Sequence, residues 1–335
     1  MNHINHEIER VFLKQATLKT PINFSGVGVH NGRSVNMTIY PAKRDTGIIF
    51  KRLDLNQNNI IEANINNIDR SYLCTRVTNR DGVSVSTIEH LMAAFSAFGI
   101  DNALVEINDA ELPALDGSSG EYVKKFIKYG IEEQKKNKKV LRILKNIKVS
   151  DGKRFISVTP SEYFSINVTI DYPDTLIGRS SLAYVHSKQN FVDCLSQART
   201  YALFEDIEKM RASGQAIGGN LNNAIVVDKH KILNSGGLRF EKEFVKHKAL
   251  DCIGDLYLLG MPLLGSIECF APGHQLNQKI VHKILEDKNN YVIEDSYINE
   301  YYNMFANIFN ENSLSTNLTN VASVSYTHLT LPTKA

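Results

Sequence analysis

The sequence carries almost no net charge, because its 38 lysines and arginines nearly balance 36 aspartates and glutamates and leave +2. Nucleic-acid binding usually shows as a strong basic excess, so this balance argues against nucleic acid as the main partner. The chain also lacks any apolar run close to the ~18 residues that span a bilayer, and residues 1–15 lack the apolar stretch of a signal peptide. We therefore expect a cytoplasmic protein without a transmembrane segment.

Cysteine motifs are missing as well. The four cysteines, Cys74, Cys194, Cys252 and Cys269, lie far apart and form no Cys-x-x-Cys pair. This spacing indicates neither a disulfide scaffold nor a thiolate metal cage. The His-Glu-x-x-His motif of many zinc peptidases is also absent.

The 335-residue chain is long enough for two domains, and its composition, 43% hydrophobic and 22% charged, is typical of a globular protein. In each half, strand-like segments precede helices. Residues 34–41 alternate apolar and polar side chains, and apolar residues at helical spacing predict helices over 86–98 and 121–130. The second half repeats this order, with a helix predicted over 190–200 and then a long helix that contains residues 247–255. We expect an α+β fold of two domains, each a β-sheet layered with helices.

The predicted domain boundaries follow the charge pattern. Residues 132–139 ("EEQKKNKK") are densely charged and lack apolar periodicity. We interpret them as an interdomain linker, with a solvated helix end as the alternative. The N-terminal domain then covers 1–131 and the C-terminal domain 140–290, and residues 291–323 form a tail without an assigned role.

The last twelve residues, 324–335 ("VSYTHLTLPTKA"), are unrelated in pattern to what precedes them. They are typical of a sequencing-library adapter translated in frame, and the alternative is a natural disordered terminus. We exclude them, His328 included, from the prediction of fold and site.

The stretch "HKALDCIGD" places polar residues in an otherwise apolar helix. His247, Asp251 and Asp255 follow at four-residue spacing and therefore lie on one stripe. A carboxylate among apolar neighbours is costly unless a positive charge meets it, so the stripe favours a cation. His247 and Asp251 can bind one ion together, although such a pair is more often a surface ion pair or a helix cap.

A third metal ligand must come from elsewhere, and the best candidate lies in "STIEHLMAAF". His90 could bind the ion while Glu89, about 100° away around the helix, faces the attacking water. Ser86-x-x-Glu89 is equally a capping-box pattern, in which the glutamate bonds back to the helix cap. His90 alone also fits a core histidine, so the residues themselves leave these alternatives open.

A further histidine, His274, follows Gly273 in "APGHQLNQ", which we expect to be a loop. A loop histidine can act as a general acid near neutral pH or can simply be exposed. Asp255 lies too far along its helix to be an obvious ligand and could instead hold a protonated histidine. Lys248 could polarise a carbonyl oxygen, bind phosphate or extend into solvent.

Seven blocks of this sequence occur in an order and at distances that resemble one known family. They are "SGVGVHNG", "STIEHLMAA", "DGSSG", "ARTYALFEDIE", "GGNLNNAIVVD", "LRFEKEFVKHKALDCIGDLYLLG" and "GHQLN". From about residue 13 to 290 the chain resembles the UDP-3-O-acyl-N-acetylglucosamine deacetylases, zinc enzymes of the committed step in bacterial lipid A synthesis. The resemblance implies hydrolysis of the substrate's acetamide to acetate and a free 2-amine. It also implies two α+β domains packed face to face with the site between them.

The resemblance assigns a role to each candidate residue. One Zn²⁺ per chain is held by His90, His247 and Asp251, with ferrous iron as the alternative metal. Glu89 corresponds to the general base and His274 to the general acid, oriented by Asp255. The residues that stabilise the tetrahedral intermediate and its oxyanion, or that contact substrate, are Lys248, Thr200, His30, Tyr201 and Cys74.

The same resemblance locates a passage for the fatty chain in the strand-like, apolar segment from about 200 to 235. Tyr201 stands where many relatives carry phenylalanine, which keeps an aromatic face. "ALF" follows where "GF" is common, which changes the acyl end of the passage.

Two other functions are compatible with these residues. A zinc peptidase is one, although the usual peptidase helix motif is absent. A catalytically inactive module that binds acylated nucleotide-sugar is the other, although Glu89 and His274 are both intact. We expect a monomer whose partner is UDP-3-O-acyl-N-acetylglucosamine.

Overall fold

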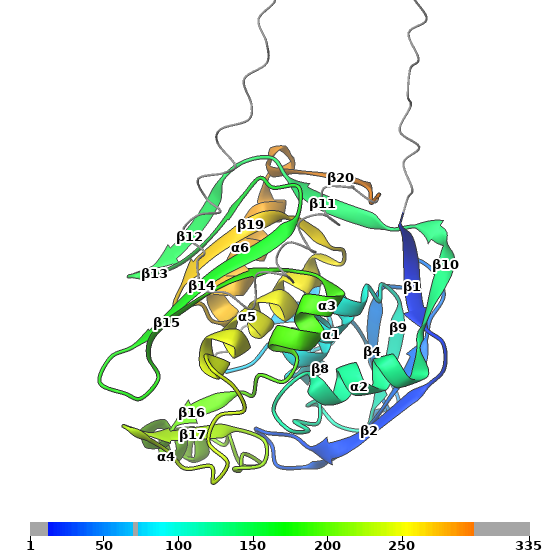
Figure 1. Cartoon of the computed structure of the whole chain (residues 1–335). Helices are drawn as coiled ribbons and strands as arrows, with labels where there is room; N and C mark the ends of the chain where they lie inside the picture. The colour runs from blue at the N-terminus through cyan, green and yellow to red at the C-terminus, as the bar shows by residue number, and fades with distance from the viewer. Residues whose placement is uncertain (1–12, 70–72, 298–335) are drawn as a thin grey trace, which may run out of the picture. The chain divides into compact units, whose positions relative to one another are not determined.

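Both halves of the chain contain β-sheets and helices (Figure 1). The computed structural model describes residues 13–69 and 73–297. The mixture of segregated strands and helices confirms the predicted α+β class. The division into two domains stays a prediction. The adapter-like residues 324–335 lie outside the described residues, as does residue 298 onward in the predicted tail.

The first half is built on a sheet in the order β2-β3-β9-β4-β5, in which only β4 and β9 pair in parallel. Val35, Met37 and Ile39 of β3 are buried, as their alternation predicts. The strands of this half are β1 (Lys14–Leu18), β2 (Ile22–Val27), β3 (Ser34–Pro41), β4 (Ile48–Arg52), β5 (Ile60–Glu62), β6 (Ile68–Asp69), β7 (Arg76–Thr78), β8 (Ser84–Ser86) and β9 (Ala103–Ile107).

The second half is built on a larger sheet, whose central strand β19 pairs with β11, β13 and β14. A small separate sheet, β16-β17-β18, lies beside helix α4. The strands are β10 (Ile131–Asn137), β11 (Lys139–Ile143), β12 (Ile147–Asp151), β13 (Arg154–Thr159), β14 (Phe164–Tyr172), β15 (Gly178–Val185), β16 (Tyr201–Leu203), β17 (Ile225–Asp228), β18 (Lys231–Ile232), β19 (Leu263–Phe270) and β20 (Tyr291–Asp295).

The helices predicted from periodicity are present. Both helices of the first half end at a glycine with positive φ, Gly99 and Gly130, which relieves the strain of that conformation. The α-helices are α1 (Glu89–Phe98), α2 (Gly120–Tyr129), α3 (Lys188–Asn190), α4 (Phe204–Ala212), α5 (Glu243–Leu256) and α6 (His274–Glu286). The short helical turns are η1 (Ile65–Asn67), η2 (Phe191–Leu195), η3 (Tyr257–Leu259) and η4 (Lys288–Asn290).

The charged segment 132–139, expected as a linker, is regular structure. It forms most of β10, which pairs antiparallel with β1, and the first residue of β11. Backbone pairing and polar contacts hold β10 in place, including a 2.7 Å hydrogen bond from Asn102 Nδ2 to Gln134 Oε1. Its side chains bury little surface, which is why no apolar pattern marks the strand.

Three further expectations need correction. Within the segment 200–235, expected to be strand-like, residues Phe204–Ala212 form helix α4. The helix expected over 190–200 ends at Leu195 as a wide turn, η2. In the tail without an assigned role, β20 pairs with β11 and so completes the edge of the large sheet. Strand β20 depends on a partner distant in sequence, β11, which local periodicity does not report.

Helices α1 and α5 cross in close contact and bring the two halves of the chain together (Figure 1). All but one residue of α1 and all but two of α5 are buried. The contact depends on Gly254 of α5, since a Cβ there would lie 2.0 Å from the carbonyl oxygen of Glu89 and 3.1 Å from the amide nitrogen of Ala93. Only glycine permits this spacing of the two helix backbones.

On its outer sides, this helix pair is supported by α2 and by the large sheet. α1 packs on α2, and α5 packs on β14, β15 and α6. Among the described residues, no helix combines the length and the apolar composition that crossing a bilayer requires.

Gly254→Ala should lower the free energy of unfolding by about 1–3 kcal/mol, because the added methyl group forces the α1 and α5 backbones apart. Chemical denaturation measures the change. Gly236→Ala is the control, since a Cβ at Gly236 meets no atom within 4 Å. Equal stability of the two variants would contradict the close helix contact.

Candidate functional site

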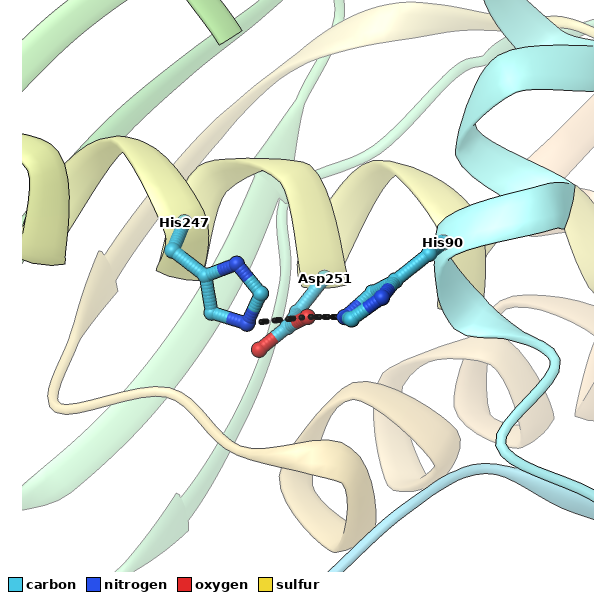
Figure 2. Close-up of side chains that lie close together, drawn as sticks. All are labelled: His90, His247 and Asp251. Carbon is cyan, nitrogen blue, oxygen red and sulfur yellow. Dashed lines mark ion pairs between the residues drawn. The ribbon is translucent and has the colours of Figure 1, made fainter. Parts of the chain in front are cut away.

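Three side chains that could bind a metal converge at the crossing of α1 and α5 (Figure 2). His90 comes from α1, and His247 and Asp251 come from successive turns of α5. Asp251 Oδ1 lies 3.5 Å from His90 Nε2 and 3.3 Å from His247 Nε2. One ligand atom from each residue lies within 4.8 Å of the others, and no second group of this kind occurs in the described part of the chain.

The donor set fits a divalent cation. Asp251 Oδ1 is buried and accepts no hydrogen bond, which is costly for a carboxylate oxygen unless a positive charge meets it. Ligand atoms about 2.0–2.1 Å from a tetrahedral Zn²⁺ lie ~3.3 Å apart, close to the two distances from Asp251 Oδ1. Burial lowers the pKa of His90, but the carboxylates of Asp251 and Glu89 outweigh burial and raise it. The electrostatic field therefore favours positive charge at this point.

His247 is held in the orientation that a metal ligand needs. Its Nδ1 lies 3.0 Å from the carbonyl oxygen of Ala198, so Nδ1–H donates to Ala198 and Nε2 carries the lone pair. Burial lowers the pKa of His247 to about 3, which keeps the ring neutral near pH 7. Arg199, which follows Ala198, forms a buried ion pair with Glu243 at the start of α5. Its Nε lies 2.8 Å from Glu243 Oε1.

Glu89 is the first residue of α1 and faces away from the helix cap. Its Oε2 accepts a 3.0 Å hydrogen bond from the backbone N–H of Thr75, and its Oε1 lies 3.7 Å from His274 Nε2. The capping-box alternative is wrong, because the backbone N–H of Ser86 donates to Ala110. Burial raises the pKa of Glu89, which makes it a stronger base than an exposed carboxylate.

His274 is the first residue of α6 and does not lie in a loop as the sequence suggested. Gly273, in extended conformation, precedes the helix. His274 Nδ1 lies 2.9 Å from Asp255 Oδ2, the geometry expected if Asp255 holds a protonated histidine. Burial lowers the pKa of His274, but the carboxylates of Asp255 and Glu89 outweigh burial and raise it to about 9.

Lys248 borders the same site. Its Nζ lies 3.0 Å from Asp251 Oδ2, whereas the two histidines lie nearest to the other carboxylate oxygen, Oδ1. The same Nζ lies 5.4 Å from the ring centre of Tyr201, whose hydroxyl donates a 3.2 Å hydrogen bond to Tyr172 Oη. Lys248 therefore carries its positive charge at the wall of the site.

A cavity of about 750 Å³ opens over these residues. It is lined by Glu89 and His274, by the three metal-site side chains, and by four other predicted residues: His30, Thr200, Tyr201 and Lys248. Asp255 lies behind His274 and is absent from the described lining. Cys74, predicted to contact substrate, is buried and also absent from it, although its neighbour Leu73 is present.

Many apolar side chains line the cavity from the segment 200–235, where a fatty chain was expected. They come from β16, α4, β17 and the neighbouring turns: Leu203, Phe204, Ile207, Met210, Leu221, Ala224, Val226 and Leu233. Asp206, Lys209 and Arg211 of α4 line the cavity as well. The apolar side chains can pack against an acyl chain.

Residues that the sequence analysis missed support the two proton-transfer candidates. Thr75 contacts Glu89, Asp255 and His274, and Asn277 Nδ2 donates a 2.8 Å hydrogen bond to Asp255 Oδ2. Neither residue stands in a motif with a chemical meaning of its own. The only signal was the position of Asn277, one helical turn after His274 in "GHQLN".

The chain is similar to known proteins over most of its length. The family model described as UDP-3-O-acyl N-acetylglycosamine deacetylase matches residues 15–286. Relatives named UDP-3-O-acyl-N-acetylglucosamine deacetylase include one from Histophilus somni (strain 129Pt), 42% identical over 278 residues, 82% of this chain and 91% of the relative. Another, from Cellvibrio japonicus (strain Ueda107), is 44% identical over 279 residues, 83% of this chain and 92% of the relative. A third, from a Nitratiruptor species, is 42% identical over 284 residues, 85% of this chain and 94% of the relative.

Adding Zn²⁺ to metal-depleted protein should raise the melting temperature, by the equivalent of about 2.7 kcal/mol at a hundredfold excess over the dissociation constant. Asp251→Asn should reduce the rise in melting temperature, because it removes the negative charge from the carboxylate whose Oδ1 accepts no hydrogen bond. Differential scanning calorimetry at stepped zinc concentrations measures both.

Asp101→Asn is the control, because Asp101 is a partly buried carboxylate, paired with Lys138 outside the cluster. It should lower the starting stability but keep the zinc response. A zinc response that Asp251→Asn leaves intact would exclude the cluster as the binding site.

Proposed function

Because the chain belongs to the UDP-3-O-acyl N-acetylglycosamine deacetylase family, we propose that it hydrolyses the acetamide of UDP-3-O-acyl-N-acetylglucosamine. The products are acetate and the free 2-amine, and the step commits its substrate to lipid A biosynthesis. One observation carries the proposal. Three side chains able to bind a metal, a buried carboxylate and a histidine with a raised pKa line one cavity, together with many apolar side chains.

His90, His247 and Asp251 would hold one Zn²⁺ per chain, and ferrous iron suits the same donors. When bound, such an ion would supply Lewis-acid chemistry towards the acetamide carbonyl and towards water. His247 is prepared for this role, since its hydrogen bond to Ala198 leaves Nε2 as the donor atom.

Glu89 would act as the general base and accept a proton from the water that attacks the acetamide carbon. His274 would act as the general acid and deliver the proton on Nε2 to the departing 2-amine. Their atoms lie on the same side of the cavity, with Glu89 Oε1 and His274 Nε2 3.7 Å apart. Each proton transfer is typically worth ~10²–10⁴-fold in rate. Asp255 would orient His274 and favour its protonated form.

Lys248 and Thr200 would stabilise the negative charge that develops on the carbonyl oxygen, since both line the cavity beside the metal cluster. His30 and Tyr201 would contact the substrate from opposite halves of the chain. The apolar side chains of β16, α4 and β17 would hold the acyl group. Cys74 would act from beneath this lining, since its side chain is buried.

The organisation of the protein follows from the same proposal. The two halves would be two domains, residues 1–131 and 140–290, that contribute His90 and His247 to a site between them. A cytoplasmic location is supported by the free thiols of Cys194, Cys252 and Cys269. The expectation of a monomer stays a prediction.

The activity is tested by incubating the metal-loaded protein with UDP-3-O-acyl-N-acetylglucosamine and measuring acetate. An N-acetylated peptide serves as the comparison substrate. Acetate from the nucleotide-sugar alone supports the proposal, and cleavage of the peptide alone would support the rival peptidase. Tight binding of the nucleotide-sugar without hydrolysis would support the inactive binding module.

Glu89→Ala should retain the metal but lose about 10²–10⁴-fold of the deacetylation rate, because it removes only the base. His90→Ala should lose both metal and activity, because it removes a ligand. Metal analysis and acetate release on the same preparations measure the two effects separately. Wild-type turnover in Glu89→Ala would rule out the proposed base.

Asp255→Asn should shift the alkaline limb of the pH profile of kcat/KM to lower pH. The general acid works only while protonated, so activity falls as pH rises through the pKa of His274, about 9. Removing the Asp255 charge lowers that pKa, although Glu89 still faces the ring. The control Asp101→Asn should leave the limb in place, and an unmoved limb in Asp255→Asn would contradict the assignment of His274.

A further inference from the structure

Thr75 lies behind the proton-transfer residues and is completely buried. It immediately precedes β7 and is absent from the described lining of the cavity. Its side chain therefore cannot reach the substrate. Any effect that Thr75 has on the reaction must pass through the groups it contacts.

The backbone N–H and the hydroxyl of Thr75 contact proton-transfer residues, and its carbonyl contacts the start of α1. Its backbone N–H donates a 3.0 Å hydrogen bond to Glu89 Oε2. Its carbonyl oxygen accepts from the backbone N–H of Ile88, the residue that caps α1. Its hydroxyl donates to Asp255 Oδ1, and the hydroxyl oxygen lies 3.1 Å from His274 Nδ1.

The hydroxyl fixes which nitrogen of His274 exchanges protons with the substrate. Because its proton is donated to Asp255, the Thr75 oxygen can only accept from His274. Nδ1–H then faces two acceptors, Thr75 Oγ1 and Asp255 Oδ2, and Nε2 is left facing Glu89 and the cavity. The ring is held in one orientation, and after it gives up the Nε2 proton the neutral ring is held in one tautomer.

We propose that Thr75 is a positioning residue of the deacetylation reaction, which holds the general base by its backbone N–H and the Asp255–His274 acid pair by its hydroxyl. This inference rests on the proposed function. Thr75 thereby contacts residues of α1, α5 and α6 at one buried position. These contacts keep Glu89 and His274 at a constant separation.

The test compares two conservative variants. Thr75→Val keeps the shape of the side chain and the backbone N–H but removes the hydroxyl. Thr75→Ser keeps the hydroxyl and removes a methyl group. Hydrogen bonds to charged groups are worth enough to predict a loss of about 10–100-fold in kcat for Thr75→Val. KM and metal content should change little, the melting temperature should fall because Asp255 Oδ1 loses a buried donor, and Thr75→Ser should retain most of kcat.

A double-mutant cycle shows whether Thr75 acts through Asp255. If it does, Thr75→Val should cost little further activity once Asp255→Asn is present, since the partner of its hydroxyl has already lost its charge. Full kcat in Thr75→Val, equal losses in Thr75→Val and Thr75→Ser, or additive losses in the double variant would each overturn the inference.

Proton NMR separates this inference from the proposed activity. The His274 Nδ1–H signal, assigned by its loss in His274→Gln, should exchange with water faster in Thr75→Val than in the wild type or in Thr75→Ser. Equal exchange rates in all three would overturn the positioning role. If wild-type protein releases no acetate while the exchange rates differ as expected, the proposed function fails, but the finding that the Thr75 hydroxyl holds His274 stands.

Discussion

The site depends on one close contact, the packing of Gly254 in α5 against the backbone of Glu89 in α1. Gly254 lies one turn after Asp251 and directly before Asp255, and Glu89 directly precedes His90. The contact that sets the distance between the two helices is therefore made within the site itself. A wider crossing would separate His90 from Asp251 and Glu89 from His274 together, because all four are carried on or packed against these two helices.

The titratable side chains around this contact lie in different electrostatic environments. Their pKa values and protonation states therefore differ, and so does the chemistry that each can perform. His247 and His274 line one cavity, yet burial lowers the pKa of the first to about 3, while neighbouring carboxylates raise that of the second to about 9. A neutral imidazole suits a metal ligand, and a protonated one suits a proton donor. The two carboxylates of α5 differ in the same way: Asp255 is surrounded by hydrogen-bond donors, whereas Asp251 keeps one oxygen without any.

The spacing of residues along the chain predicted those elements and site residues that depend on neighbours close in sequence. The spacing of apolar residues gave α1 and α2, and the four-residue spacing of His247, Asp251 and Asp255 placed all three on one buried stripe. The residues alone left Glu89 undecided between cap and catalysis, because that choice depends on Thr75, which no helix pattern includes. Strand β10 was missed because it is held by backbone pairing with β1, which is distant in sequence. His274 was assigned to a loop because α6 has no capping side chain that would mark its start in the sequence. The hydroxyl of Thr75 meets partners 180 and 199 residues away, a distance at which sequence spacing carries no information.

The most direct test of this account is an anomalous difference map from crystals of the purified protein, recorded on both sides of the zinc and iron absorption edges. The account predicts a single strong peak bounded by His90 Nε2, His247 Nε2 and the Asp251 carboxylate, with the edge identifying the metal. A peak at another place, or α1 and α5 separated with no ion shared between them, would contradict the claim that their crossing builds the catalytic centre.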